Sequence, residues 1–184
     1  MRWVTLGFAA LMVSGCGYNR IQTLDEQVNG YKGQIEVQLQ RRADLVPNLV
    51  ETVKGYAKHE DSVFTKVAEA RAKLGGAIQG GSLPQMADAN QALSGTLSRL
   101  IAIAEAYPQL KANENFKDLQ VQLEGTENRI ATARSDYNAA VQTYNAFIRQ
   151  FPQVLTAKML SKQPREYFEV TDAAKREAPQ VKFD

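Results

Sequence analysis

The feature that most constrains the fold is a long series of apolar residues at helical spacing in the second half of the chain. From Phe116 to Tyr144 these positions recur at alternating intervals of three and four residues, which is the heptad pattern of a helix packed along one side. They are Phe116, Leu119, Leu123, Thr126, Ile130, Ala133, Tyr137, Ala140 and Tyr144, and only Thr126 breaks the apolar series. Ile148 and Phe151 continue the series to Pro152, which ends or bends a helix. The pattern predicts a helix of about 50 Å whose aromatic residues pack in a core.

Three further amphipathic helices are predicted ahead of this one. Their apolar positions are Ile21, Leu24, Val28, Tyr31, Ile35, Leu39, Val46, Val50, Val53 and Ala57, then Val63, Val67, Ala70 and Leu74, and then Leu93, Leu97, Leu100, Ile101 and Ala104. The glycines of GGAIQGGS, residues 75–82, predict a mobile connection between the second and third helices. Ser82 with Gln85 fits a capping box at the start of the third helix, and Tyr107-Pro108 ends it.

Four amphipathic helices with short connections close most simply as an antiparallel bundle. The chain has neither long alternating runs of β-branched residues nor an Asn-Gly or Asp-Gly hairpin turn. We therefore predict an all-α fold, with an elongated antiparallel four-helix bundle of long helices over residues 21–158. The apolar period then fades. Residues 159–184 are predicted to be an irregular C-terminal tail packed on the bundle, with Tyr167, Phe168 and Phe183 as anchors.

The N-terminus predicts export and a lipid anchor. A short basic start, Met1-Arg2, precedes 11 apolar residues, which is fewer than the roughly 20 that a bilayer-spanning helix needs. The following VSGC resembles the lipobox of bacterial lipoproteins, although Cys16 could also be a chance cysteine. We expect residues 1–15 to be a signal peptide and residues 16–20 a tether acylated at Cys16, with chains such as palmitate. Gly17 favours the periplasmic face of the outer membrane if the source has two membranes.

A polar cluster surrounds a proline inside the first predicted helix. Its members are Arg41, Arg42, Asp44, Pro47 and Asn48. Pro47 removes one backbone donor, so the carbonyls near residues 43 and 44 need other partners. One interpretation is a kinked helix whose polar groups pair with glutamates of the long helix, for example Glu124 or Glu127. The other is an interaction surface on which the arginines bind the carboxylates of a partner or a lipid phosphate.

The composition argues against catalysis, metal binding and nucleic-acid binding. The net charge is only +2, and no basic run is interleaved with aromatic residues. His59 is the one histidine and Cys16 the one cysteine, so neither a zinc site nor a catalytic triad is predicted. Adjacent carboxylates such as Asp25 and Glu26 point in different directions on a helix and are interpreted as solvated charge. We predict no cofactor, no metal and no catalytic residue, with a hydrolase using His59 as the weakest hypothesis.

Several longer motifs resemble the LemA family. They are RRADLVPNLVETVKGYAKHE, EAYPQLKANENFKDLQ, LEGTENRIATARSDYNAAVQTYN, PREYF and the closing REAPQVKF, in that order along nearly the whole chain. The resemblance implies a helical bundle tethered to a membrane at its N-terminus, with no established activity and no known catalytic residues. Many relatives carry an uncleaved N-terminal helix in place of VSGC. Tyr31 stands where relatives often carry tryptophan.

These observations favour a non-enzymatic adaptor or scaffold in the bacterial cell envelope. The expected partners are the membrane, through the N-terminal lipid, and another envelope protein. Exposed heptad positions could equally serve self-association. The alternative is a carrier that holds a lipid or a small apolar ligand in the bundle.

Overall fold

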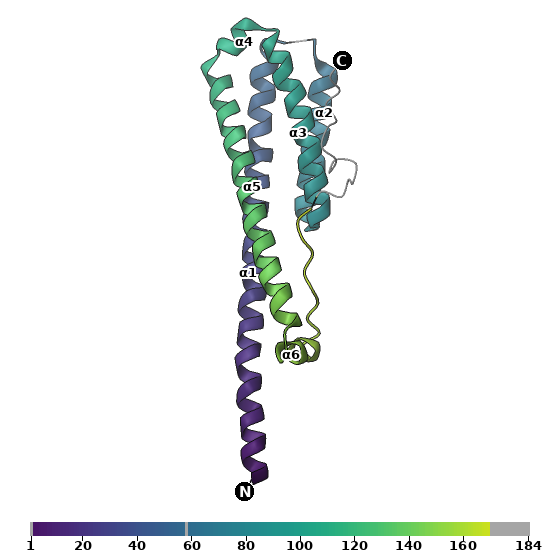
Figure 1. The fold of residues 1–184 in the computed structure, drawn as a ribbon. Coiled ribbons are helices and arrows are strands. Elements are labelled where there is room, and N and C mark those ends of the chain that lie inside the picture. The colour runs from purple at the N-terminus through teal and green to yellow at the C-terminus, as the bar shows by residue number, and fades with distance from the viewer. Residues whose placement is uncertain (1, 58, 170–184) are drawn as a thin grey trace, which may run out of the picture. The chain divides into compact units, whose positions relative to one another are not determined.

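The computed structural model describes residues 2–57 and 59–169, with side chains from residue 17 onward. The predicted anchor Phe183, most of the predicted tail and the side chain of Cys16 lie outside these descriptions. The helices are α1 (Arg2–Lys54), α2 (Asp61–Gly80), α3 (Leu83–Glu105), α4 (Pro108–Ala112), α5 (Glu114–Arg149) and α6 (Gln153–Met159) (Figure 1). Over the described residues the chain forms no strand, so the all-α class is confirmed. The finer arrangement, an elongated antiparallel four-helix bundle, stays a prediction.

The chain divides into two compact units. Unit 1 comprises Met1–Glu36 and Ile130–Tyr167, and unit 2 comprises Val37–Arg129 and Phe168–Asp184. Helices α1 and α5 each contribute residues to both units, whereas α6 belongs to unit 1 and α2, α3 and α4 belong to unit 2. Each unit is therefore built from segments that are far apart in the sequence.

Unit 1 has a core made by the facing apolar stripes of α1 and α5. The buried side chains are Ile21, Leu24, Val28 and Ile35 from α1, and Ile130, Ala133, Tyr137, Val141, Tyr144 and Ile148 from α5. The predicted core role of Tyr137 and Tyr144 is confirmed, since they are 2% and 1% exposed. Phe151 was wrongly placed in this series and is 81% exposed. The reason is that α5 ends at Arg149, so the helical register no longer applies.

The core of unit 2 is formed by side chains of α1, α2, α3, α4 and α5. The fully buried side chains include Leu39, Val46, Leu49 and Val53 from α1, Val67 and Leu74 from α2, Met86, Leu93 and Leu100 from α3, and Leu110 from α4. Helices α2 and α3 lie side by side (Figure 1). The turn between α4 and α5 is held by Asn113, whose Oδ1 accepts a hydrogen bond from the amide of Phe116 at 3.0 Å. This is an N-cap for α5.

The glycine-rich stretch is helical, contrary to the prediction of a mobile connection. Helix α2 runs through Gly75, Gly76 and Gly80, and only Gly81 adopts a positive φ, 66°, to end it. Leu74 and Ala77 in the same stretch are buried. Their packing outweighs the low helix propensity of glycine. Ser82 is the N-cap of α3, but its side chain makes no capping hydrogen bond to any described residue, so the predicted capping box is not formed.

Alanine at Gly75 and Gly76 should therefore stabilise the protein. Each change removes conformational freedom from the unfolded chain, and a Cβ at either position meets no described atom within 4 Å. We expect a gain of up to about 1 kcal/mol per site in the free energy of unfolding, measured by urea denaturation. Gly81→Ala is the matched control and should destabilise, because alanine is strained at positive φ. A loss of stability at the first two sites would contradict a helical α2 in solution.

The segment after α6 is extended up to the last described residue, 169. Of the predicted anchors, Phe168 is buried at 2% exposure, whereas Tyr167 is 42% exposed and does not act as one. The short helix α6 itself was not predicted, because its seven residues are too few for an apolar period to show.

Candidate functional site

The first polar site is buried in unit 2 around Arg42, which is only 5% exposed. Its Nη1 donates to Oδ1 of Asn90 on α3 at 2.9 Å and also pairs with Oε2 of Glu127 on α5. Glu127 is one of the two glutamates predicted as partners. Burial lowers the pKa of the Arg42 guanidinium, while the charge and hydrogen bond of Glu127 oppose that shift. The guanidinium still stays protonated at neutral pH, since arginine loses its proton only under strongly basic conditions.

The backbone defect at Pro47 is repaired by α2. In a regular helix the amide of residue 47 would donate to the carbonyl of Ala43, and proline has no such amide. Here Nε of Arg71 donates to the carbonyl oxygen of Ala43 at 2.8 Å. The charged donor thus replaces the missing backbone bond and ties α2 to α1. Arg71 lies outside the predicted polar cluster, because nothing local in the sequence links it to a carbonyl 28 residues earlier.

The remaining members of the predicted cluster lie on the surface of α1. Arg41, Asp44 and Asn48 are exposed, and Pro47 is half-buried. Asp44 accepts a hydrogen bond from Nε2 of Gln40 on the same helix at 2.8 Å. The cluster therefore separates into one buried residue, Arg42, and an exposed set formed by Arg41, Asp44 and Asn48.

A groove of about 480 Å³ runs beside Pro47 between α1 and α2. Its walls are partly apolar and partly charged. The lining residues are Val46, Pro47, Val50, Glu51, Lys54, Asp61, Phe64, Thr65, Ala68 and Arg71. Lys54 lies 5.7 Å from the centre of the Phe64 ring and 3.2 Å from the Glu51 carboxylate. The groove offers apolar contact together with both signs of charge.

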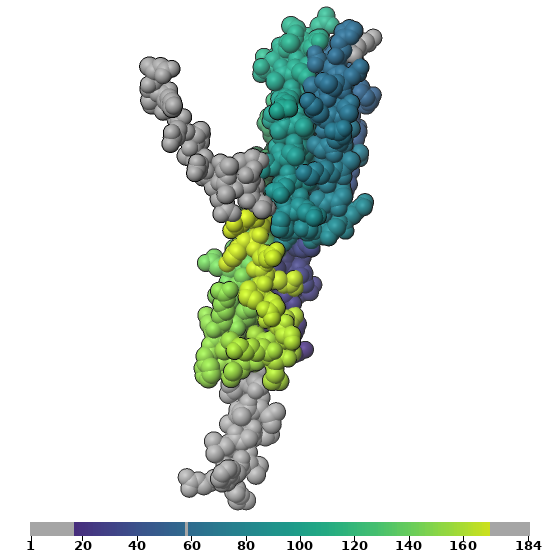
Figure 2. Space-filling model, turned by 90° about the vertical axis from the view of Figure 1, so that its right-hand side faces the viewer, coloured from purple at the N-terminus to yellow at the C-terminus, as the bar shows by residue number. Residues whose placement is uncertain are grey.

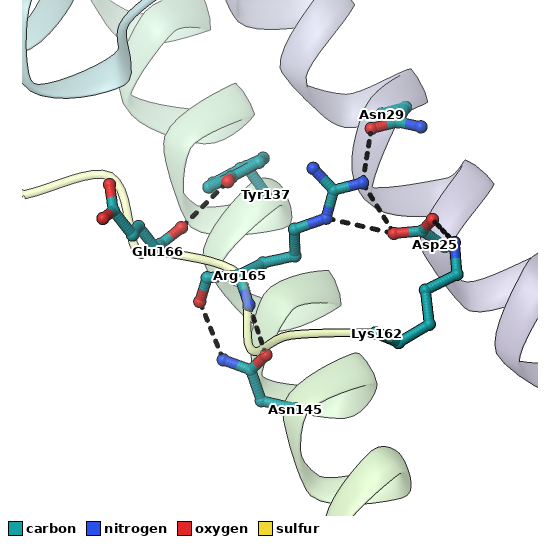
Figure 3. A network of polar contacts seen from close by, with 7 residues as sticks. All are labelled: Asp25, Asn29, Tyr137, Asn145, Lys162, Arg165 and Glu166. Carbon is teal, nitrogen blue, oxygen red and sulfur yellow. Dashed lines mark hydrogen bonds and ion pairs between the residues drawn. The ribbon is translucent and has the colours of Figure 1, made fainter. Parts of the chain in front are cut away.

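The second polar site lies in unit 1 and is centred on Asp25 (Figure 3). Oδ2 accepts from Nζ of Lys162 at 2.6 Å, and Oδ1 accepts from Nη2 and Nε of Arg165 at 2.7 and 3.0 Å. Asp25 is 8% exposed. The interpretation of this carboxylate as solvated charge was therefore wrong, although its neighbour Glu26 is exposed. We call Asp25, Lys162 and Arg165 the Asp25 clamp.

Side chains of α5 bind the backbone next to the clamp (Figure 3). Asn145 Oδ1 accepts from the amide of Arg165 at 2.8 Å, and Asn145 Nδ2 donates to the carbonyl of Arg165 at 2.9 Å. The hydroxyl of Tyr137 donates to the carbonyl of Glu166 at 2.9 Å. These bonds supply partners to a backbone that belongs to neither a helix nor a sheet. Residues 162–167, which include most of the PREYF motif, are thereby held along unit 1 as a strap.

The charges of the clamp reinforce each other. Burial acts to raise the pKa of Asp25, but the hydrogen bonds and charges of Lys162 and Arg165 outweigh it, so this pKa is lowered. The hydrogen bond to Asp25 raises the pKa of Arg165. Burial raises the pKa values of Tyr137 and Tyr144. All four shifts favour the state in which Asp25 is negative and its partners are positive or neutral.

The stability that Asp25 contributes should disappear in acid. Because its folded pKa lies below the ordinary aspartate value of about 3.9, the contribution is complete above that pH and is lost as the pH falls through the folded pKa. We expect the difference in unfolding free energy between the wild type and Asp25→Asn to be constant from neutral pH to about pH 4 and to shrink below it. Urea denaturation of both proteins across this range measures it. A difference that widens on acidification would contradict the clamp.

The other candidate residues form no site over the described chain. His59 is exposed near the start of α2. The described residues contain no group of three His, Cys, Asp or Glu side chains placed to hold a metal ion. Within the same residues, no helix combines the length and apolar character needed to cross a membrane.

Comparisons with known proteins agree with the resemblance seen in the sequence. The model of the LemA family matches residues 31–183. Magnetosome proteins MamQ 2 and MamQ 1 of Paramagnetospirillum magneticum are each 31% identical over 175 residues, covering 83% of this chain and 64% of the relative. Magnetosome protein MamQ of Magnetospirillum gryphiswaldense is 29% identical over 174 residues, covering 82% of this chain and 64% of the relative. The chain thus spans less than two thirds of the length of these relatives.

Proposed function

The chain belongs to the LemA family, and we propose on that basis that it is a membrane-anchored, non-enzymatic adaptor or scaffold of the bacterial cell envelope. The proposal rests on one observation: among the residues that the structure describes, the buried charged ones hold the fold together and do not form a catalytic site. Arg42 and Asp25 are each occupied in joining elements of one unit, and the exposed set of Arg41, Asp44 and Asn48 is left for a partner. The relatives carry a name that refers to a structure and not to a reaction.

The adaptor role predicts a protein contact at the exposed set. Photo-crosslinking probes at Arg41, Asp44 and Asn48 in living cells should give one specific envelope-protein product, identified by mass spectrometry. Probes at the exposed residues Lys66 of α2 and Ser98 of α3 are the matched controls. Equal products from all positions, or crosslinks only within the chain itself, would count against the adaptor role.

The proposed anchor is a lipid on Cys16 after removal of residues 1–15. Its support is the short apolar stretch followed by VSGC. We further propose the periplasmic face of the outer membrane if the source has two membranes. Cells fed labelled palmitate should label the wild type, and Cys16→Ser should abolish both the label and recovery in the membrane fraction. A mature protein with an unmodified Cys16 would overturn this anchor.

The groove beside Pro47 favours the alternative, a carrier of a lipid or small apolar ligand. The apolar part of its lining, with Val46, Val50 and Phe64, offers contacts to such a ligand. Native mass spectrometry of gently purified protein should then find a ligand mass that is lost in Ala68→Trp, which fills the groove. Recovery of empty wild-type chains alone would contradict the carrier role.

A further inference from the structure

Three large apolar side chains are exposed together at α6. Phe151 is 81% exposed, Leu155 57% and Met159 87%. They follow one another at intervals of four residues, so Leu155 and Met159 share one face of α6 and Phe151 precedes it in the adjoining turn. Single exposed apolar residues need no explanation, but a group of large ones on one short element marks a contact surface. We call these three residues the α6 face.

The opposite side of α6 packs on α1 next to the proposed anchor. A Cβ placed on Gly17 would lie 3.7 Å from both Gln153 Cγ and Thr156 Oγ1, so this side of α6 touches the backbone of α1 there. Ala157, also on this side, is buried. Gly17 directly follows Cys16 in the sequence. Leu155 and Met159 therefore lie on the side of α6 that is turned away from α1, and α6 meets α1 one residue after the proposed lipid site at Cys16.

The chain on both sides of α6 in the sequence carries charges of one sign only. From residue 137 to residue 165 the sequence contains no aspartate or glutamate and four cations, which are Arg149, Lys158, Lys162 and Arg165. Lys162 and Arg165 hold Asp25, whereas Arg149 and Lys158 are exposed and lie close in sequence to Phe151 and Met159. In Figure 2 the yellow-green atoms, which include α6, are visible on the surface of unit 1.

We propose that the α6 face inserts into the surface of the bilayer that holds the N-terminal anchor. Phenylalanine, leucine and methionine would enter the boundary between headgroups and acyl chains, and Arg149 and Lys158 would pair with anionic headgroups. Such a contact adds a second membrane attachment beside the lipid and fixes how unit 1 is oriented on the membrane. The inference rests on the proposed anchoring at Cys16, because that lipid places the bilayer beside α6.

The test uses the full-length lipoprotein in vesicles of phosphatidylethanolamine and phosphatidylglycerol. Cys16 is the only cysteine and its thiol is consumed by the lipid, so Met159→Cys provides a single site for an environment-sensitive fluorophore. We expect a severalfold rise and a blue shift in emission on vesicles, with quenching by lipid nitroxides. Val121→Cys, on a residue 66% exposed in unit 2, is the matched control and should remain in water.

Each outcome decides the proposal, and vesicle flotation separates it from the anchor. If the protein floats with the vesicles but the fluorophore at residue 159 remains exposed to water, the α6 contact is overturned and the anchor is left in place. Protein that neither floats nor shields the label overturns both. Shielding that appears on concentrating the protein without vesicles would assign the α6 face to a second copy of the chain and would also overturn the membrane contact.

Discussion

Replacing Glu127 by alanine should lower the free energy of unfolding by about 2 kcal/mol. The change leaves the guanidinium of Arg42 buried with Asn90 as its remaining partner, and an uncompensated buried charge is costly. A fully buried pair would lose about 3–5 kcal/mol. We expect less here, because the side chain of Glu127 is 47% exposed and water can reach the vacated position.

Removing the charge as well should recover part of this loss. In the double variant Arg42→Met with Glu127→Ala, the buried cation is gone and methionine fills much of its volume. Nε of Arg42 has no hydrogen-bond partner among the described residues, so the native pair is itself incompletely compensated. The double variant should therefore be more stable than Glu127→Ala alone, although Asn90 loses a donor.

Glu124→Ala is the matched control for this series. Glu124 is exposed on the same helix, accepts a hydrogen bond only from Gln120 in the described structure, and should change stability by less than about 0.5 kcal/mol. Urea denaturation followed by circular dichroism measures all three variants. Equal losses for Glu124→Ala and Glu127→Ala, or a double variant that is no more stable than Glu127→Ala alone, would contradict a buried pair at Arg42.

The fold could be predicted wherever apolar spacing follows a helix. The seam from Phe116 to Ile148 and the stripe from Ile21 to Ala57 both became buried faces, because burial of such a stripe is the main source of helix stability in proteins. The predictions failed at two places where packing or the end of a helix outweighed the local sequence pattern. Packing at Leu74 and Ala77 kept the glycine-rich stretch helical, and the end of α5 at Arg149 turned Phe151 outward.

Of the two polar sites, the sequence predicted the pair at Arg42 but not the Asp25 clamp. The pairing of Arg42 with Glu127 followed from the need to compensate a charge on a packed helix. Asp25 carried a signal that was missed, since it lies four residues after Ile21 and three before Val28 and so belongs to the buried stripe. Its partner Arg165 is 140 residues away in a segment without periodicity, where spacing gives no information on contacts.

Asp25→Asn should release the strap from unit 1 and lower the free energy of unfolding by about 2 kcal/mol. Asparagine keeps the shape of the side chain but loses the charge that holds Lys162 and Arg165. Those two side chains are 25% and 42% exposed, so they can turn into water and are not left as buried charges. The loss is therefore that of two partly exposed ion pairs and not that of an unpaired buried ion.

Trypsin can measure how often the segment that carries Lys162 and Arg165 opens locally. Lys162 and Arg165 are both cleavage sites on an extended segment, and in the wild type the clamp and Asn145 hold that segment against the helices. Cleavage that proceeds through local opening rises with the population of the open form, so losing about 2 kcal/mol of clamp energy should speed it by at least tenfold. Glu26→Gln removes the same charge from the exposed neighbouring position and should leave the cleavage rate unchanged. Equal rates for both variants would mean that the strap is held by Asn145 and Tyr137 alone, with the ion pairs making no contribution.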